Sequence, residues 1–392
     1  MPALPPPARS DAAQTPGAAG LVALADRCVQ CGLCLPHCPT YRLDRNEAES
    51  PRGRIAYIRA VASGQLAPGP AGDTHLDHCL GCRRCEAACP AGVRYGELLV
   101  GARAAQAARR PLPARTRAVL ALLARPRLLA TLAGLQRRVG RWLPAAWWPV
   151  PPPPAPAPKA PTTGREATPG RAGDAVAVFA GCIARSHESG SRAALARLLG
   201  AAGLATIEPA GQGCCGAAAA HAGDAAGAAA LATANRRAFA GHERVLCLAS
   251  GCQDTLARSL GDAATVEDAL LALDRVADRL VFRAANRRVA LHLPCTQRSV
   301  VRSEAALRRL LARVPGLDVV ELPDTGCCGA AGLHQLAEPA RAAALRAPLL
   351  QALAASGASE LLSANIGCRL HLAGGTKIPV RHPIDFLAEH LA

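Results

Sequence analysis

The feature that most constrains the fold is a four-cysteine spacing that occurs twice in the first hundred residues. Each run places three cysteines at every third position and a fourth cysteine four residues later, directly before a proline. The first run is Cys28, Cys31, Cys34 and Cys38, and the second is Cys79, Cys82, Cys85 and Cys89. This spacing is typical of thiolate ligands to [4Fe–4S] clusters. Two complete runs predict a segment that folds around two such clusters.

The cysteine before each proline is predicted to serve the opposite cluster. Three thiolates on one tight turn can reach three irons of one cubane, whereas the fourth is carried away from them. We therefore define a first ferredoxin set, Cys28, Cys31, Cys34 and Cys89, and a second ferredoxin set, Cys79, Cys82, Cys85 and Cys38. The 40 residues between the two runs are too many for a compact hairpin ferredoxin. Inserted helices are expected, which makes residues 21–100 an α-helical ferredoxin-type domain.

A second cysteine pattern is repeated in the C-terminal half. Cys182 precedes the pair Cys214-Cys215 by 32 residues, and Cys295 precedes the pair Cys327-Cys328 by the same 32 residues. Each pair is followed by glycine, and each unit closes with one more Gly-Cys. The first repeat set is Cys182, Cys214, Cys215 and Cys252, and the second repeat set is Cys295, Cys327, Cys328 and Cys368. Soft thiolates suit an iron–sulfur cluster or zinc, so these sets are candidate third and fourth metal sites of either kind.

Other residues near the repeats have simpler expected roles. Cys247 has no counterpart in the second unit and is expected in the core, as is His292 on a strand. His221 and His334 recur six residues after each pair. Capping or surface positions are expected for both histidines, with metal ligation as the alternative.

Apolar strand patterns alternate with Ala- and Leu-rich helical patterns in both units. The expected strands are 175–179, 205–208 and 245–248 in the first unit, and 289–293, 319–322 and 361–363 in the second. The expected helices are 191–202 and 225–240, then 304–312 and 339–355. This alternation predicts parallel sheets in an α/β, multi-domain protein. Each cysteine site then follows the carboxyl end of a strand, where open sheets bind ligands.

Composition divides the chain further. We expect a disordered tail at 1–20, a basic helical segment at 101–145, and a proline-rich linker at 146–173, because residues 144–161 include nine prolines. The two repeat domains are expected at 174–285 and 286–392.

The net charge of +16 is concentrated in one region. Residues 98–165 contain eleven Arg and one Lys but no Asp or Glu. Interleaved Leu and three Trp suit this segment to an anionic membrane surface, with packing of the Leu stripe on the protein as the alternative. Residues 103–141 have no aromatic stacking platform or base-reading motif, so nucleic acid is not an expected partner. A start without a basic region and apolar run favours the cytoplasm, and no apolar stretch reaches 18 residues.

The chain resembles the iron–sulfur subunits of glycolate oxidase, within the wider group related to heterodisulfide reductase. The resemblance rests on Cys38-Pro39-Thr40-Tyr41, Ser50-Pro51-Arg52-Gly53-Arg54-Ile55, Leu76-Asp77-x-Cys79-Leu80-Gly81-Cys82, Gln212-Gly213-Cys214-Cys215-Gly216, His292-Leu293-Pro294-Cys295 and Asn365-Ile366-Gly367-Cys368.

The resemblance implies an electron-transfer subunit. An FAD-containing partner would oxidise glycolate, or a related hydroxy acid such as D-lactate, and this chain would pass electrons singly toward a membrane acceptor such as quinone. The alternatives are a partner that oxidises lactate or glycerol 3-phosphate, and a disulfide-reducing subunit. The second alternative is disfavoured because each repeat ends in a single cysteine where the reductase family has Cys-x2-Cys.

Overall fold

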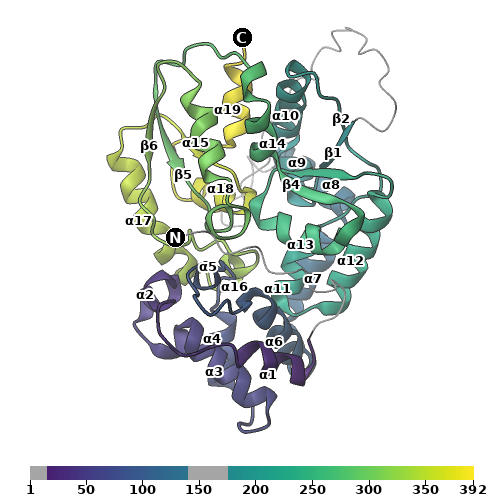
Figure 1. Ribbon diagram of the computed structural model, residues 1–392, viewed down its shortest axis with the longest axis vertical. Helices are drawn as coiled ribbons and strands as arrows, with labels where there is room; N and C mark the ends of the chain where they lie inside the picture. The colour runs from purple at the N-terminus through teal and green to yellow at the C-terminus, as the bar shows by residue number, and fades with distance from the viewer. Residues whose placement is uncertain (1–15, 140–174) are drawn as a thin grey trace.

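The computed structural model describes residues 16–139 and 175–392, and shows one helical unit below two α/β units that lie side by side (Figure 1). The expected linker 146–173 and residues 1–15 of the expected tail lie outside the described residues. Residues 18–20 of that tail belong to the first helix. The helical ferredoxin-type region followed by two parallel sheets agrees with the α/β prediction.

Short helices make up the N-terminal unit and include the insertion expected between the two cysteine runs. They are α1 (Ala18–Ala25), α2 (Pro39–Asp44), α3 (Pro51–Ala62), α4 (Pro70–Asp77), α5 (Arg84–Ala87) and α6 (Tyr95–Arg109). Three of them begin with proline, whose fixed φ and missing N–H suit the first helical position. Ser50 caps α3, because its hydroxyl accepts a hydrogen bond from the Gly53 N–H at 3.0 Å.

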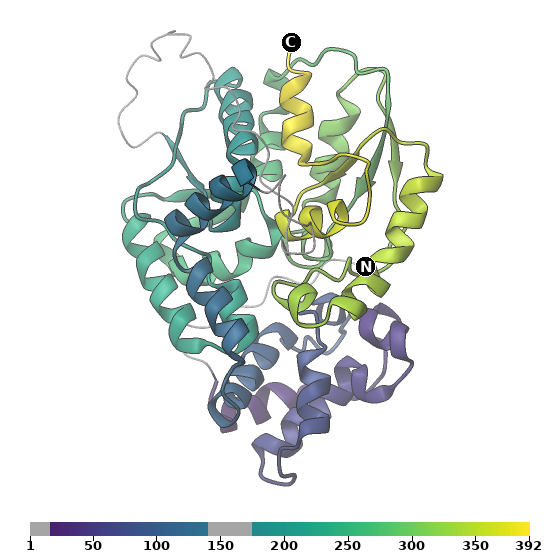
Figure 2. The same cartoon turned by 180° about the vertical axis from the view of Figure 1, so that it is seen from behind.

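The basic segment continues as α7 (Ala114–Leu123) and α8 (Pro126–Val139). Prolines separate these helices: α6 ends before Pro111, α7 follows Pro113 and α8 starts at Pro126. Both helices run along the back of the first α/β unit (Figure 2). Among the described residues, no single helix is long and apolar enough to cross a membrane; α7 and α8 pass that test only as a pair, bent by 99°.

Four parallel strands form the sheet of the first α/β unit, in the order β2-β1-β3-β4. The elements are β1 (Val176–Phe179), α9 (Ile183–His187), α10 (Ser189–Ala201), β2 (Thr206–Ile207), α11 (Ala217–Ala222), α12 (Ala225–Ala238), β3 (Arg244–Cys247), α13 (Ser250–Leu260), β4 (Thr265–Asp268) and α14 (Ala269–Arg275). The strand order reverses between β1 and β3, and a crevice at such a point is where doubly wound sheets bind ligands.

The second unit repeats this topology with the order β6-β5-β7-β8. Its elements are β5 (Arg288–His292), α15 (Glu304–Ala312), β6 (Asp318–Glu321), α16 (His334–Ala337), α17 (Pro339–Ala355), β7 (Leu361–Ser363), α18 (Ile366–Ala373), β8 (Val380–Arg381) and α19 (Pro383–Glu389). The sequence did not predict β4 and β8. Both are short edge strands that carry charged residues, so neither has the apolar run that identifies a buried strand.

One apolar core joins the two α/β units. It contains Leu195 and Leu198 of α10 together with Leu307 of α15 and Phe386 of α19, all fully buried. The C-terminal helix crosses to the first unit, where Asp385 accepts a hydrogen bond from the Ser191 hydroxyl at 3.0 Å. The two units are therefore held in one arrangement, which sets how their cysteine loops meet.

Candidate functional site

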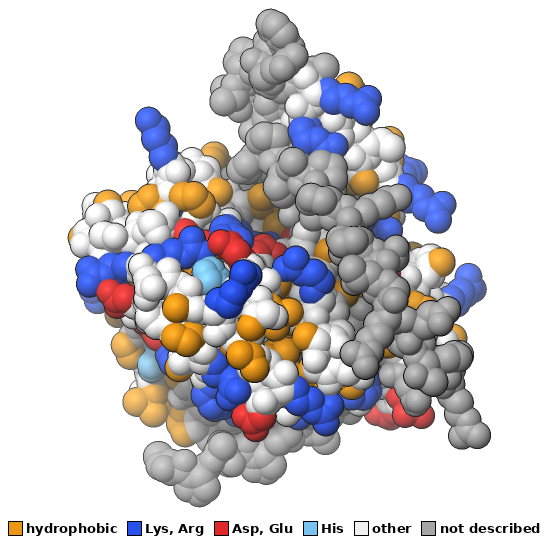
Figure 3. Space-filling model, turned by 90° about the horizontal axis from the view of Figure 1, so that it is seen from above, with side chains coloured by type: hydrophobic (Ala, Val, Ile, Leu, Met, Phe, Trp, Pro, Cys, Tyr) orange, Lys and Arg blue, Asp and Glu red, His pale blue; other side chains and the backbone are white. Residues whose placement is uncertain are grey.

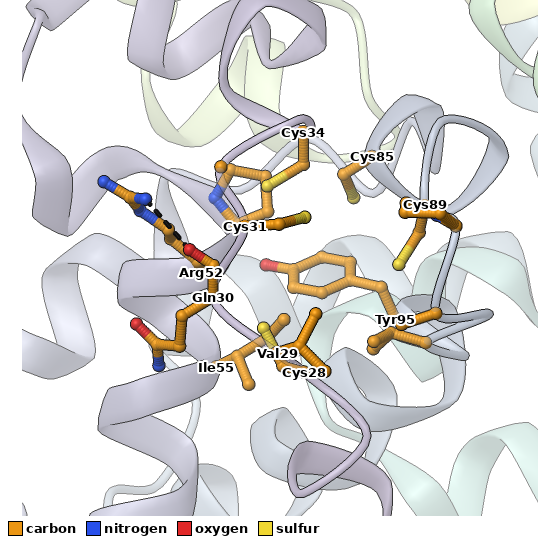
Figure 4. Close-up of a pocket in the computed structure, with 15 residues that line it drawn as sticks. Cys28, Val29, Gln30, Cys31, Cys34, Arg52, Ile55, Cys85, Cys89 and Tyr95 are labelled. Carbon is orange, nitrogen blue, oxygen red and sulfur yellow. Dashed lines mark hydrogen bonds between the residues drawn. The ribbon is translucent and has the colours of Figure 1, made fainter.

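The first ferredoxin set lines one cavity. Cys28, Cys31, Cys34 and Cys89 face the same space, with the ring of Tyr95 in its wall (Figure 4), and Cys85 of the second ferredoxin set also lines it. The other wall residues are mainly apolar, and burial raises the pKa of Cys34 to about 11. A cavity lined by cysteine sulfurs, with no histidine or carboxylate among its described wall residues, fits an iron–sulfur cluster. Cys89 thus lies with the three cysteines of the other run, as the cross-ligation hypothesis requires.

The two cysteine runs share one backbone conformation. The second and fourth residues after the first cysteine have positive φ in both runs: Gln30 and Gly32 in the first, Gly81 and Arg83 in the second. At each of the two positions, one run has a glycine and the other run has a different residue. The positive φ is therefore a property of the cysteine motif and does not depend on glycine. Alternating left-handed residues turn successive backbone N–H groups toward one side, which creates a concave site for an anionic group.

The second ferredoxin set is buried more deeply. Desolvation holds the pKa of Cys82 and of Cys85 well above the ordinary value, and the charges of Cys38 and Cys79 act on both thiols. Cys38 lies 3.3 Å from the Thr40 hydroxyl. The structure therefore brings Cys38 to the cysteines of the other run. Binding of a cluster by these four thiols remains a prediction.

Arg54 is a functional residue that the sequence reasoning did not single out. Its guanidinium is 1% exposed and lies near Cys38 and Cys79, whose charges act on it. It donates to the Glu49 carboxylate at 2.6 Å and to the Thr40 hydroxyl at 3.0 Å. A buried positive charge beside thiolates stabilises their anionic form. The Ser-Pro-Arg-Gly-Arg motif contains it, but nothing in the motif shows that this side chain points inward.

Charged and polar side chains surround the Glu49 carboxylate, next to the second ferredoxin set. His75 and His78 each place Nδ1 2.6 Å from one carboxylate oxygen, and Arg54 binds the other. Burial alone would raise the pKa of Glu49, but the hydrogen bonds with the two histidines and the charge of Arg54 together lower the pKa. These contacts tie the end of α4, and with it Cys79, to α3.

Tyr95 lies between the two ferredoxin sets. Its ring lines the cavity of the first set, and its hydroxyl donates to the Cys79 sulfur at 3.6 Å. The side chain is almost wholly buried, which raises its pKa well above the ordinary value. A single residue therefore borders both ferredoxin sets.

Each repeat set forms a chain of sulfur contacts at the carboxyl ends of its strands. Cys214 accepts hydrogen bonds from Cys182 and Cys215, which lower its pKa well below the usual value, and Cys215 also contacts Cys252. In the second unit, the Cys295 and Cys327 sulfurs are 3.8 Å apart. Cys327 has its pKa lowered in the same way by Cys295 and Cys328, and Cys328 contacts Cys368. All-thiol donor sets suit iron–sulfur clusters or zinc equally, so the geometry does not choose.

Buried amides and a glycine hold the cysteine-pair loops. Gln212 accepts a hydrogen bond from the Ala180 N–H at 2.7 Å, and Asn235 donates to the Cys214 carbonyl at 2.8 Å. Gly329 has φ +90°, and a Cβ there would lie 2.6 Å from the Ala342 carbonyl oxygen. The glycine after each pair is thus needed both for its left-handed conformation and, in the second unit, for a close helix contact.

The second repeat set packs directly on the second ferredoxin set. Cys82 and Cys295 border an apolar cluster that contains Leu80, Leu345 and Cys327. An ion pair between Arg84 and Asp324, with N and O atoms 2.9 Å apart, fastens the two loops beside these cysteines. Figure 1 shows this junction where α5 meets the second unit.

Asn365 connects the two repeat sets. Its side-chain nitrogen donates to the Cys368 sulfur at 3.3 Å, and its side-chain oxygen accepts from the Gly251 N–H, next to Cys252, at 3.3 Å. The hydroxyls of Ser250 and Thr296 also lie 2.8 Å apart across the same junction. The four cysteine sets are therefore linked in series from the first ferredoxin set to the first repeat set.

The remaining residues have the following positions. Cys247 and His292 are buried, as expected, and His292 lies 2.9 Å from the Ser363 hydroxyl. His334 is buried beside the Gly329 carbonyl, at 3.2 Å, rather than on the surface. His221 packs against Gly81 of the second cysteine run, away from the first repeat set. None of these side chains joins a cysteine set in the part of the chain that the structure describes.

Comparison with known proteins shows the family. A model of the 4Fe-4S dicluster domain matches residues 24–93, and a model of the cysteine-rich domain matches residues 176–257 and 289–373. The glycolate oxidase iron-sulfur subunit of Escherichia coli (strain K12) is 32% identical over 93% of both chains. This chain belongs to the family of glycolate oxidase iron–sulfur subunits. The dicluster domain implies two [4Fe–4S] clusters, and the all-cysteine donor sets fit them.

Two further relatives indicate which parts are shared more widely. The probable glycolate oxidase iron-sulfur subunit of Bacillus subtilis (strain 168) is 30% identical over 92% of this chain and 93% of that one. A fumarate reductase (CoM/CoB) subunit from Methanothermobacter marburgensis is 26% identical over 51% of this chain and 42% of that one. The glycolate oxidase subunits thus match nearly the whole chain, including the basic segment, whereas the third relative matches about half of it.

Proposed function

We propose that this chain relays single electrons from an FAD-containing subunit that oxidises glycolate to glyoxylate toward a membrane acceptor such as quinone. The near full-length similarity to glycolate oxidase iron–sulfur subunits supports the choice of substrate. D-lactate, which gives pyruvate by the same removal of two electrons and two protons, is the closest alternative substrate of the partner.

The observation that carries the proposal is the serial arrangement of the cysteine sets. Tyr95 contacts both ferredoxin sets, Cys82 packs near Cys327 and Cys295, and Asn365 joins the two repeat sets. An enzyme that reduced its own substrate at a cluster would need only one such site. A series of cysteine sites in contact with one another suits a protein that passes electrons from one site to the next.

The division of labour follows from the chemistry of the cofactors. Oxidation of an alcohol carbon removes two electrons, and a flavin can accept both of them at once. A [4Fe–4S] cluster exchanges one electron at a time, so the flavin passes the pair on in two steps. The role of this chain is to hold the clusters, tune them through groups such as Arg54, and keep water from them.

The test uses the reconstituted chain under anaerobic conditions. Dithionite should bleach its visible absorption, whereas glycolate alone should leave the chain oxidised. Adding the flavoprotein partner should allow glycolate to bleach it. Bleaching by glycolate without the partner would overturn the electron-relay role. If, with the partner present, D-lactate or glycerol 3-phosphate bleaches the chain and glycolate does not, the proposed substrate is wrong but the relay role stands.

A further inference from the structure

A cavity of about 240 Å³ lies between α6 of the ferredoxin-type region and helices α11, α12 and α13 of the first α/β unit. No cysteine lines it among the residues that the structure describes. Its apolar walls are Ala side chains of α12 with Leu99 and Val100 of α6, and charged and polar side chains, mostly of α12 and α13, line the rest. Two wall residues connect it to the second ferredoxin set: Gly81 lies between Cys79 and Cys82, and Tyr95 donates to the Cys79 sulfur.

The polar groups in this cavity suit an uncharged ligand. Arg83 is paired with Glu86 at 2.6 Å and with Asp254 at 2.9 Å, and Arg258 is paired with Asp254 at 2.5 Å. Arg83 and Arg258 are thereby neutralised, and Arg236, which also lines the cavity, donates to the Ser259 carbonyl at 2.9 Å. A cavity that combines apolar wall residues with hydrogen-bonding groups is the usual form of a small-molecule site.

The imidazole of His221 packs against the cysteine loop at Gly81. A Cβ built at Gly81 would lie 3.0 Å from its ring, and neither ring nitrogen makes a hydrogen bond to a residue that the structure describes. Burial, and secondarily the charge of Arg103, lower its pKa to about 4. The imidazole is therefore neutral near pH 7 and has one N–H to donate.

We propose that this cavity binds the ring of a quinone, with His221 donating a hydrogen bond to one carbonyl oxygen. The ring lies against the Gly81 loop, so electrons leave the second ferredoxin set here. Each quinone takes two electrons, delivered singly by the reduced clusters, and two protons from water, and its two carbonyls become the hydroxyls of the quinol. The inference rests on the proposed function only in that the electrons come ultimately from the hydroxy acid.

An adjoining apolar cavity provides an approach for a lipid-soluble ligand. It shares Ala104, Gly223 and Ala225 with the first cavity and continues beneath α7, where Leu120 lines it. α7 precedes α8, which carries the exposed apolar face of the basic segment. A quinone tail can therefore lie along apolar surface from the ring site to the helices that are suited to a membrane.

The test measures reoxidation of the holoprotein by ubiquinone-1. The reconstituted chain is reduced with stoichiometric dithionite, mixed anaerobically with the quinone, and followed by recovery of its visible absorption. Ferricyanide serves as a small oxidant that needs no ring site. Because dithionite supplies the electrons, the result does not depend on glycolate or on a partner subunit.

Two variants and their controls address the site. Ala232→Phe fills the cavity from α12 and should slow reoxidation by ubiquinone-1 at least tenfold, whereas Ala230→Phe, on an exposed position of the same helix, should not. His221→Leu should slow it about tenfold through the lost hydrogen bond, and His221→Gln should recover part of the rate. Rates with ferricyanide, and the cluster EPR signals, should stay unchanged in all four variants.

Equal quinone rates in the wild type, Ala232→Phe and His221→Leu would overturn the proposal. So would a parallel loss with ferricyanide, because that result would place the effect in the clusters themselves. If the holoprotein reacts with ubiquinone-1 as expected but no flavoprotein lets glycolate reduce it, the proposed substrate fails and the quinone site stands.

Discussion

At the scale of single residues, the position of Cys38 decides how the two candidate clusters share their ligands. Its side chain is buried, and its charge acts on Cys82 and Cys85 of the other run. We therefore expect Cys38→Ser to damage the cluster of the second ferredoxin set and to spare the cluster of its sequence neighbours. EPR of the reduced protein, with iron counted per chain, measures which signal is lost. Cys247→Ala, which removes a buried cysteine outside all four sets, should lose neither signal; damage confined to the first set would refute cross-ligation.

Gly53 is equally critical for a steric reason. A Cβ at this position would lie 2.2 Å from the Glu47 carbonyl oxygen, and the short helical turn at Glu47–Glu49 leads into Ser50, which caps α3. We expect Gly53→Ala to destabilise the N-terminal unit by about 2–4 kcal/mol, as overpacking against backbone does at its upper range. Thermal unfolding of the holoprotein measures this. Gly69→Ala, where nothing lies within 4 Å of the added Cβ, is the matched control; equal melting temperatures for both would contradict the steric argument.

At the scale of elements, α8 presents an unusual face. Leu128, Leu132 and Leu135 follow helical spacing and are 46%, 43% and 53% exposed. Arg125, Arg127 and Arg138 flank them, and residues 98–139 contain no acidic side chain. Viewed from the end opposite the ferredoxin-type region, basic side chains outnumber acidic ones over the visible surface (Figure 3). This combination suits shallow binding to an anionic bilayer.

Vesicle flotation tests this interpretation of α8. The holoprotein should float with anionic phosphatidylglycerol vesicles at low salt and bind less at high salt, since each basic side chain near the surface contributes roughly 1 kcal/mol that salt screens. Replacing Leu128, Leu132 and Leu135 by Ser should weaken binding at least tenfold. Val281→Ser, at a residue that is 68% exposed elsewhere, should have no effect. Binding that is absent, or insensitive to salt, would favour packing of the Leu stripe on the protein.

At the scale of the whole molecule, we expect buried histidines to make the assembly of units sensitive to acid. His382 is fully buried, contacts the Leu248 carbonyl of the first unit at 3.1 Å, and accepts a hydrogen bond from the Ile384 N–H that starts α19. Desolvation, and then the charge of Arg369, lower its pKa well below the ordinary value. Desolvation also lowers the pKa of His292 to about 4. Both side chains stay neutral in the folded protein at pH values where the unfolded chain takes up protons.

These histidines determine how the stability of the folded protein changes with pH. A histidine in the unfolded chain gains its proton near pH 6.5, so the unfolded state binds more protons below that pH and stability falls as the pH decreases. Stability should be full above about pH 7 and should decline by up to roughly 1.4 kcal/mol per pH unit for each such histidine. Urea unfolding of the holoprotein at pH 5.5 and 7.5 measures the decline. His382→Asn keeps a capping side chain but does not titrate, so it should reduce the slope; an unchanged slope would exclude His382 as a cause.

The sequence by itself determined the local features of this protein. The cysteine spacing is local because one tight turn sets how far apart its thiolates can lie. The strand and helix patterns are local because the side chains that face a neighbouring layer recur at the period of each element. The predicted ranges 304–312, 339–355 and 361–363 agree with α15, α17 and β7 to the residue. The carboxyl-end position of every repeat cysteine follows from the same patterns.

Only the tertiary structure decided how these local features meet. Contacts such as Cys82 near Cys327, Asn365 between the repeat sets, and Tyr95 between the ferredoxin sets join residues far apart in the chain. They depend on the shared core of the two α/β units and on the docking of α5 and α6. The sequence shows no periodicity for such contacts, because packing between units is set by surface shape rather than by the hydrogen-bonded repeat of one element. The inward charge of Arg54 and the cavity beside His221 were missed for the same reason.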